Sequence, residues 1–583
     1  MWTVVAALCL SLAACALPAR PDVPVVLPTP TNTPAAAPDE ALGGDPTETP
    51  GAGEAPGPVH LVKDAPSVPM LSMRRSIGGD AVSMEYTIGS GSYTTVGGRE
   101  MPYQLRGVMA VPSGEGTHPL VLILHGAHEE EDESKRFDTG FGYLVKALVD
   151  EGFVAVSIDV AMPYMQRYGG NDDYIEKMAA IVNGHMEGLM AANAGEPLFP
   201  SDLTGKIDMQ KVGMLGHSRS GAAIFQLASE QIGKGIGVNA LLSLAPAADL
   251  WVEFPENIPV AFLVPQYDGD VVQLDGIYLY DYMGGKVSGD HSATVLMGAN
   301  HNFFNRNLTR DDSIADEVKD AYPALTREEQ ETYLADFAHA FFASTLDGRS
   351  GMDFYAMDAD ISAMFGRDVN RQVRLKGTTD LIDAASAGGF AAVGAQVRHV
   401  SDSVFFQQDE VLLNTVTTSI LQTIVDGTRD KEADIEYVAF DRDLIRIEWE
   451  REGASVSVTP AISDFSQKKA MTLSLVVDAA SELNRPGAPL PLTVTLRDAA
   501  GNEIGVAAAP DQNALRRYPG EVRKTQLTDD FAVAYYEPTT PLGMWVIPLS
   551  LFEGMDTSSV QSMELSFGES GSGALYLAAW QLQ

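Results

Sequence analysis

A series of short, wholly apolar segments between residues 119 and 297 constrains the fold of this chain more than any other feature. Each has the length of a β-strand and is apolar at successive positions, which is typical of strands covered on both faces. Helices are expected between several of them, at residues 141–150, 174–193 and 222–231. This alternation predicts a mostly parallel, doubly covered sheet with its functional site at the carboxyl ends of the strands. The apolar segments are residues 119–124, 152–158, 212–215, 240–244, 260–264 and 293–297.

The chain is too long for one hydrophobic core. It has 583 residues, whereas a single core rarely grows past roughly 250–300 residues. We expect a first folded domain at residues 61–350, a linker at 351–384 and an all-β sandwich at 385–583. The sandwich is predicted from runs that alternate apolar and polar residues, as at 445–450 and 492–497, with turns between them.

The first 60 residues carry the signs of export rather than of a fold. Residues 1–15 are short and apolar, end in Leu-Ala-Ala-Cys and resemble a bacterial lipoprotein signal in which Cys15 receives the lipid. An ordinary signal peptide with an incidental cysteine is the alternative. Residues 16–60 are rich in Pro and Thr and predict a disordered tether. We therefore expect an extracytoplasmic lipoprotein anchored to the membrane at the cell surface.

The charge balance excludes one class of partner. The chain has 39 basic and 79 acidic residues and a net charge of −40. Nucleic acids bind to clustered Lys and Arg, so no nucleic-acid partner is expected. The acidity is interpreted as self-repulsion that keeps an exported protein soluble, with adaptation to salt as the alternative.

A candidate nucleophile follows one of the apolar segments. After residues 212–215 the sequence runs Gly-His-Ser218-Arg-Ser-Gly221, and a predicted helix follows. This pattern resembles the nucleophile elbow of α/β-hydrolases, Gly-x-Ser-x-Gly, in which a sharp turn from strand to helix projects the serine into a cleft. Ser220 takes the place of the second glycine. Serine is small, so we expect the turn to close and Ser218 to be the nucleophile.

A serine nucleophile requires a base and an acid, and both candidates follow later strands. His301 lies directly after residues 293–297 and is the predicted base. Asp268 follows residues 260–264 and is the predicted acid that orients the histidine, with Asp270 as its rival. The Asp-x-Asp spacing also occurs in calcium loops, but the Gly and Glu of an EF-hand are missing, so no metal is expected.

The oxyanion hole requires two backbone N–H groups. One is expected from Arg219, the residue after the nucleophile, and the other from the loop after residues 119–124. That loop contains a His-Gly pair, and Ala127 is the predicted donor, with His128 second. His125 is predicted to be structural, and the acidic residues 129–133 to be a solvated loop.

Residues 80–345 resemble the secreted bacterial α/β-hydrolases of the serine esterase and lipase kind. The resemblance implies the α/β-hydrolase fold, a Ser-His-Asp triad, an acyl-enzyme and no cofactor. Several methionines lie between the strand at 152–158 and the nucleophile elbow. They are interpreted either as the lining of an acyl site or as core packing. They are Met162, Met165, Met178, Met186 and Met190.

The C-terminal domain resembles galactose-binding-like jelly rolls, which implies carbohydrate as a further partner. Its aromatic residues are either exposed to bind sugar or buried in the core, and those considered are Trp449, Tyr535, Tyr536 and Trp545.

The sequence thus predicts a serine hydrolase acting on small-molecule or polymeric carboxylic esters. A polysaccharide deacylase or feruloyl-type esterase, recruited to its substrate by the sandwich, is the first alternative. A non-enzymatic surface-binding lipoprotein that retains the hydrolase scaffold is the second.

Overall fold

The structure is a computed structural model of the whole chain. The predicted signal with Cys15, and the predicted tether up to residue 58, lie outside the residues that it describes. The described residues are 59–64, 82–128, 132–170, 172–248, 253–271, 274–284, 286–313, 323–348, 354–357, 363–406, 437–478, 481–484, 490–509, 512–515, 525–526, 535–536 and 542–583. Among the helices in these ranges, none is long and apolar enough to cross a membrane.

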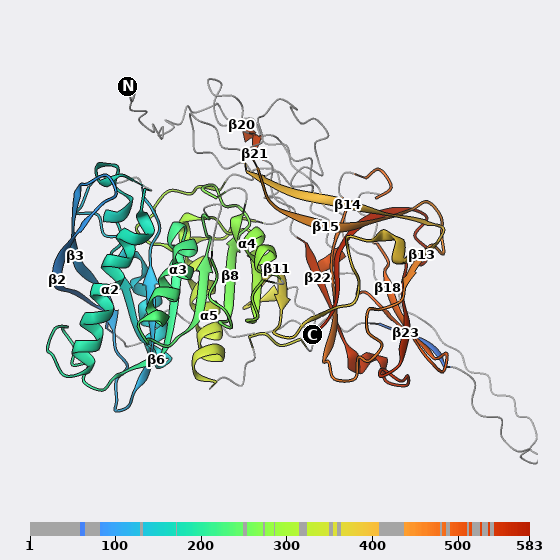
Figure 1. Cartoon of the computed structure of the whole chain (residues 1–583), viewed down its shortest axis with the longest axis horizontal. Helices are drawn as coiled ribbons and strands as arrows, with labels where there is room; N and C mark the ends of the chain where they lie inside the picture. Colours follow the sequence, from blue (N-terminus) through green and yellow to red (C-terminus); the bar gives the residue numbers. More distant parts are fainter. Residues whose placement is uncertain are drawn as a thin grey trace, which may run out of the picture.

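A mixed sheet of ten strands forms the centre of the first folded region (Figure 1). Its order is β10-β11-β9-β8-β7-β6-β4-β5-β3-β2. The strands from β9 to β5 are all parallel to their neighbours, and antiparallel pairs extend the sheet at both edges. The strands are β2 (Met84–Thr94), β3 (Glu100–Ala110), β4 (His118–Leu124), β5 (Val154–Ile158), β6 (Ile207–His217), β7 (Val238–Leu244), β8 (Val260–Pro265), β9 (His291–Leu296), β10 (Ala363–Met364) and β11 (Arg367–Arg374).

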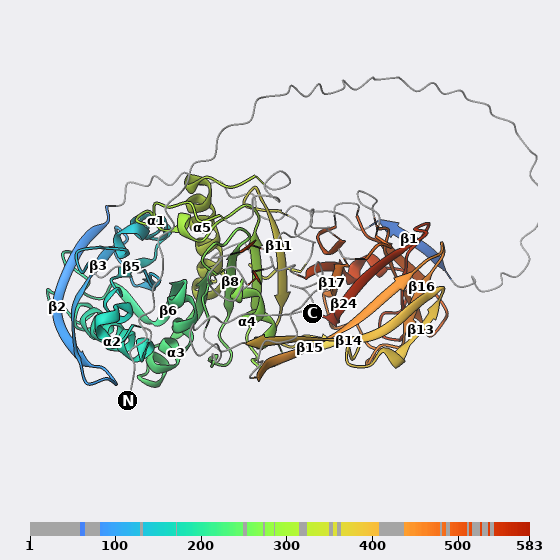
Figure 2. The same cartoon turned by 90° about the horizontal axis from the view of Figure 1, so that it is seen from above.

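Successive residues of β4 pack into different cores on the two faces of this sheet. Leu120, Leu122 and Leu124 belong to one core, and Val121 and Ile123 to the other. Burial on both faces explains why these strands are continuous apolar runs in the sequence. The first face is covered by α2 (Tyr174–Asn193), α3 (Arg219–Gly233) and α4 (Asp275–Met283), and the second by α1 (Gly142–Asp150) and α5 (Arg327–Phe342) (Figure 2).

The C-terminal region is built from two further sheets of six strands each. One has the order β1-β19-β18-β23-β16-β13, and the other β14-β15-β24-β17-β22 with β12 beside β24. A common core that includes Trp449, Trp545 and Trp580 draws residues from both. The strands are β1 (His60–Asp64), β12 (Thr379–Asp380), β13 (Phe390–Val393), β14 (Ala395–Phe406), β15 (Tyr437–Trp449), β16 (Ser455–Val458), β17 (Ala470–Val477), β18 (Thr493–Asp498), β19 (Glu503–Ala507), β22 (Gly543–Pro548), β23 (Val560–Ser566) and β24 (Gly573–Leu582), besides the separate pair β20 (Thr525–Gln526) and β21 (Tyr535–Tyr536).

The segment predicted as a linker, residues 351–384, contains strands instead. β10 and β11 extend the large sheet, and β11 pairs antiparallel with β9. The sequence of β11 is mostly polar and shows no strand pattern, but Val369 and Val373, four residues apart and therefore on one face, are buried in the core. Pairing with β9 thus determines its structure. β1, expected at the start of the first domain, pairs parallel with β19 of the C-terminal region.

The two regions are joined through β11. The Gln372 side chain donates a hydrogen bond of 2.8 Å to the Leu542 carbonyl, and the Gln583 side chain donates one of 2.9 Å to the Val373 carbonyl. Met544 of β22 lies in the core of the large sheet. The C-terminal region therefore packs directly against the edge that β11 forms.

Candidate active site

Ser218 lies at the sharp turn between β6, which ends at His217, and α3, which begins at Arg219. Its φ of 59° and ψ of −128° place a non-glycine residue in a strained conformation that is typical of functional turns. The turn needs small neighbours. A Cβ atom on Gly216 would lie 2.1 Å from the Ser220 carbonyl oxygen, and one on Gly221 would lie 3.0 Å from Pro246. The Gly-His-Ser-Arg-Ser-Gly sequence thus forms the expected turn from strand to helix.

Ser220, which departs from the Gly-x-Ser-x-Gly pattern, stabilises this turn. Its hydroxyl donates a hydrogen bond of 2.5 Å to the His125 carbonyl oxygen and lies 3.1 Å from the Tyr164 hydroxyl. The side chain is fully buried. Serine at this position therefore ties the Ser218 turn to the loop after β4.

The loop after β4 packs against the Ser218 side chain. A Cβ atom on Gly126 would lie 2.5 Å from Ser218 Cβ and 3.1 Å from its Oγ, so only glycine fits here. Ala127 directly follows this contact, and Arg219 begins α3 on the other side of the serine. The two predicted oxyanion donors thus lie in the two segments that adjoin Ser218, and the Arg219 N–H belongs to the first turn of a helix.

His301 and Asp268 come together at the same edge of the sheet, after β9 and β8. His301 Nδ1 lies 2.9 Å from Asp268 Oδ2, and both side chains are almost completely buried. The other carboxylate oxygen of Asp268 accepts hydrogen bonds from the backbone N–H groups of Asp270, at 3.0 Å, and Val271, at 2.6 Å. These bonds fix the carboxylate, which in turn orients the imidazole ring.

Asp270, the rival acid, also contacts His301, but on the opposite side of the ring. Its Oδ2 lies 3.4 Å from His301 Nε2, and 61% of its side chain is exposed. The two aspartates therefore bracket the imidazole: Asp268 holds Nδ1 from the protein interior, and Asp270 faces Nε2 from the solvent side.

The carboxylates around His301 favour its charged form. Burial alone would lower the pKa of His301, but Asp268, then Asp270 and Asp312, raise it to about 10. These carboxylates thus favour the protonated form of the resting imidazole. It becomes a base only when the negative field around it weakens or the pH rises.

Asp312 was not predicted from the sequence. Its carboxylate accepts hydrogen bonds from the backbone N–H groups of Gly269, His301 and Asn302, at 3.0, 3.3 and 3.0 Å. It therefore joins the loop that carries the acid to the loop that carries the histidine. Asp312 directly follows Asp311 in an irregular segment, and such a pair gives no sequence signal for this role.

His217, the residue before Ser218, packs against the His301 ring. The two rings are 4.6 Å apart, and His217 Nε2 donates a hydrogen bond of 3.2 Å to the His301 carbonyl oxygen. Burial and the neighbouring His301 and His128 rings lower the pKa of His217 well below 6.5. His217 is therefore neutral and acts as a spacer that fixes the position of His301.

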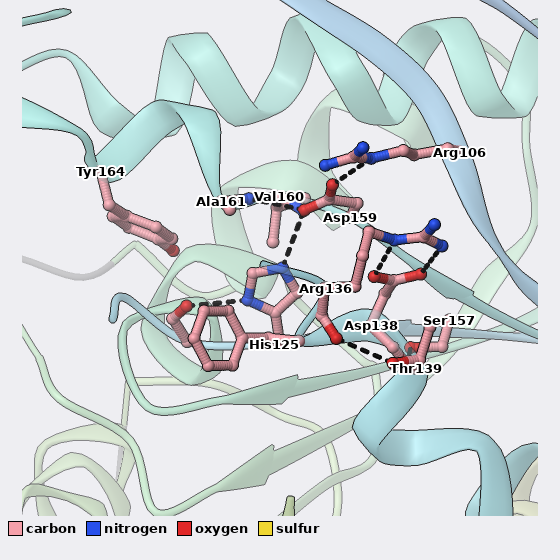
Figure 3. Close-up of polar contacts among 12 residues, drawn as sticks. Arg106, His125, Arg136, Asp138, Thr139, Ser157, Asp159, Val160, Ala161 and Tyr164 are labelled. Atoms are coloured by element: carbon pink, nitrogen blue, oxygen red, sulfur yellow. Dashed lines mark hydrogen bonds and ion pairs between the residues drawn. The ribbon is translucent and has the colours of Figure 1, made fainter. Parts of the chain in front are cut away.

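His125 belongs to a buried network beneath the site (Figure 3). Its Nδ1 lies 2.9 Å from the Gly126 carbonyl oxygen and its Nε2 lies 3.3 Å from Asp159. Arg106 donates to the same carboxylate at 2.6 Å. Burial alone would raise the pKa of Asp159, but His125 and Arg106 lower it to about 2. This network fixes the Gly126 loop, which agrees with the structural role predicted for His125.

The methionines of residues 162–190 divide between core and surface. Met165, Met178 and Met186 are buried, and the last two pack in the core of the large sheet. Met190 is 42% exposed. The structure thus places Met178 and Met186 in the core-packing role.

The tryptophans considered for sugar binding are core residues. Trp449 is 1% exposed and stacks on Phe567, and Trp545 is fully buried. The side chains of Tyr535 and Tyr536 lie outside the described part of the structure. Neither tryptophan is available to a ligand. Among the described residues, no group of three or more His, Cys, Asp or Glu is arranged to hold a metal ion.

The comparisons with known proteins concern the first part of this site. A sequence model of the chlorophyllase family matches residues 96–260. A comparison with curated proteins found no match. The matched region contains the Gly126 loop and Ser218 and ends before Asp268 and His301. Residues 96–260 are thus similar to the chlorophyllases, and this match implies an α/β-hydrolase fold and supports an ester-cleaving hydrolase.

Proposed function

We propose that the protein is a serine hydrolase that cleaves carboxylic esters through an acyl-enzyme. Ser218 is the nucleophile, His301 the general base and Asp268 the acid. The observation that carries this proposal is the buried contact of 2.9 Å between Asp268 and His301 Nδ1. It leaves Nε2 as the nitrogen that exchanges protons with the serine, as the triad mechanism requires.

In the acylation step, Ser218 Oγ attacks the ester carbonyl carbon while His301 Nε2 accepts the hydroxyl proton. The carbonyl oxygen becomes an oxyanion, which accepts hydrogen bonds from the backbone N–H groups of Ala127 and Arg219. The C–O bond to the alcohol then breaks, and Nε2 returns the proton to the leaving oxygen.

In the deacylation step, water replaces the alcohol. His301 Nε2 takes a proton from the water as it attacks the acyl carbon. The bond between this carbon and Ser218 Oγ then breaks, Nε2 returns the proton to Oγ, and the carboxylic acid product leaves. The imidazolium that forms in each step is stabilised by Asp268, whose own position is fixed by two backbone N–H groups. His301 Nε2 therefore accepts and returns the proton in both steps.

The proposal is tested with p-nitrophenyl acetate, butyrate and octanoate and with a fluorophosphonate probe. We expect Ser218→Ala to abolish both hydrolysis and labelling. Ser229→Ala is the matched control, because Ser229 lies on the same helix and its hydroxyl donates to the Phe225 carbonyl of that helix. Activity that persists in Ser218→Ala, or a folded wild type that shows neither activity nor labelling, would contradict the proposal.

We also propose that the enzyme is anchored outside the cytoplasm through a lipid on Cys15, with residues 16–58 as a tether, because residues 59 and 60 belong to the folded C-terminal region. The support is the Leu-Ala-Ala-Cys sequence after an apolar segment. In cells fed a labelled fatty acid, the wild type should incorporate label and Cys15→Ser should not. Label retained by Cys15→Ser would exclude this anchor.

A further inference from the structure

The side of His301 that faces the substrate carries an exposed negative charge. Asp270 Oδ2 lies 3.4 Å from Nε2, the atom that must exchange protons with Ser218 and with the leaving alcohol. Asp268 occupies Nδ1, so it cannot be the group that meets a substrate. Asp270, by contrast, is 61% exposed. A ligand that approaches Nε2 therefore meets this carboxylate.

Of the described charged and titratable groups around His301, Asp270 is the one whose side chain is largely exposed to solvent. Asp312 is bonded to the backbone N–H groups of Gly269, His301 and Asn302. His217 packs on the ring and is neutral, and burial also lowers the pKa of His128 well below 6.5. Among the described residues, Asp270 forms an ion pair with His301 alone.

The position of Nε2 defines where the alcohol portion of an ester lies. In the proposed function, on which this inference rests, Nε2 delivers the proton to the leaving oxygen. That oxygen must therefore come within hydrogen-bond distance of Nε2. The next few atoms of the alcohol then lie within reach of Asp270, because its carboxylate is already in contact with Nε2.

We propose that Asp270 makes this site selective for esters whose alcohol portion carries a positive charge, such as an alkylammonium group, a few atoms from the ester oxygen. The cation replaces the imidazole as the ion-pair partner of Asp270. The ammonium also weakens the negative field that holds the Nε2 proton, so Nε2 loses this proton to solvent water and can then accept the proton of Ser218. An anionic group at the same position is repelled, and the net charge of −40 raises the local concentration of cationic ligands.

The test compares two esters of the same shape and different charge. Acetylcholine carries a quaternary nitrogen, and 3,3-dimethylbutyl acetate has a neutral carbon in its place. We expect kcat/KM of the full-length wild type to favour the cationic ester by about tenfold at low salt, the scale of one close and partly exposed charge pair. In Asp270→Asn this ratio should fall toward one. The ratio of two esters cancels any common loss of activity that the substitution causes.

The matched control is Glu256→Gln, which removes one exposed negative charge before β8, at the opposite end of the strand from Asp270. It should keep the wild-type ratio. Added salt should reduce the preference of the wild type, because the carboxylate is exposed.

The outcomes separate the two proposals. If the wild type hydrolyses both esters and Asp270→Asn keeps the same ratio, the inference is overturned and the proposed function stands. If Glu256→Gln lowers the ratio as much as Asp270→Asn, the preference comes from the overall charge and the inference fails. If neither ester is hydrolysed and the fluorophosphonate probe does not label Ser218, the proposed function fails together with it.

Discussion

Asp268 Oδ2 and His301 Nδ1 lie 2.9 Å apart, and the two side chains are 1% and 2% exposed. A neutral imidazole has one N–H, and this contact places it on Nδ1. Asp268→Asn would allow the other tautomer and remove the charge that stabilises the imidazolium. We expect kcat to fall by about 10³- to 10⁴-fold with little change in KM. Asp270→Asn should not lower kcat on a neutral ester in this way, because it leaves the contact between Asp268 and Nδ1 intact, and equal losses in the two variants would contradict the assignment of the acid.

The dependence of activity on pH follows from the raised pKa of His301. The protonated imidazole cannot accept the Ser218 proton, so kcat/KM should rise as pH increases and level off only above the pKa, which is about 10. Asp270→Asn removes one of the carboxylates that raise the pKa, so its midpoint should move to lower pH. The measurement is kcat/KM on a neutral ester from about pH 6 to about pH 11. A wild-type midpoint near 6.5 that Asp270→Asn leaves in place would refute this prediction.

Ser220 provides a separate test of the turn. Ser220→Ala keeps a good helix former and removes the hydroxyl that bonds to the His125 carbonyl. We expect the free energy of unfolding to fall by about 1–2 kcal/mol, since a buried carbonyl loses its partner. Ser220→Gly, which restores the common pattern, should lose about 0.5–1 kcal/mol more through backbone entropy. Denaturant unfolding measures both values, and a Ser220→Gly variant as stable as the wild type would show that the hydroxyl has no role.

The buried Asp159 carboxylate, which contacts His125 and Arg106, should stabilise the fold in a pH-dependent way. The folded-state pKa of Asp159 is about 2, below the ordinary 3.8. The ionised carboxylate therefore stabilises the folded state above about pH 3.8, and this stabilisation is lost as the pH falls toward 2. At pH 7 it amounts to about 2 kcal/mol. Asp159→Asn should lose this stability at neutral pH, and its deficit should shrink in acid. Asp150→Asn, at an exposed position, is the control. A deficit that is constant with pH would exclude an electrostatic origin.

The sequence predicted best the parts of the molecule that are governed by local physics. Segments buried on both faces, such as β4, must be apolar throughout, and the Ser218 turn requires small residues close by. Both constraints are visible in one stretch of chain. The positions of the Asp268 and His301 loops followed from the rule that parallel strands end at one edge.

The features that the sequence did not predict depend on contacts between distant segments. Asp312 acts only because its loop returns to the backbone of Gly269 and His301. Asp270 was considered as an alternative to Asp268, whereas the structure places the two on opposite ring nitrogens, and spacing along the chain cannot distinguish the two sides of a ring. The tryptophans were ambiguous because core and binding aromatics look the same without the fold.

Because β11 pairs with β9, the first folded region depends on residues beyond its predicted end at residue 350. β9 leads to His301, and β11 covers its edge. A chain cut at residue 350, where a linker was predicted, would keep Ser218, Asp268 and His301 but lose this cover. β9 would then be an unprotected edge strand, and such strands pair with other copies of themselves. The isolated catalytic half should therefore aggregate, while a cut placed after β11 would preserve the strand that holds the base.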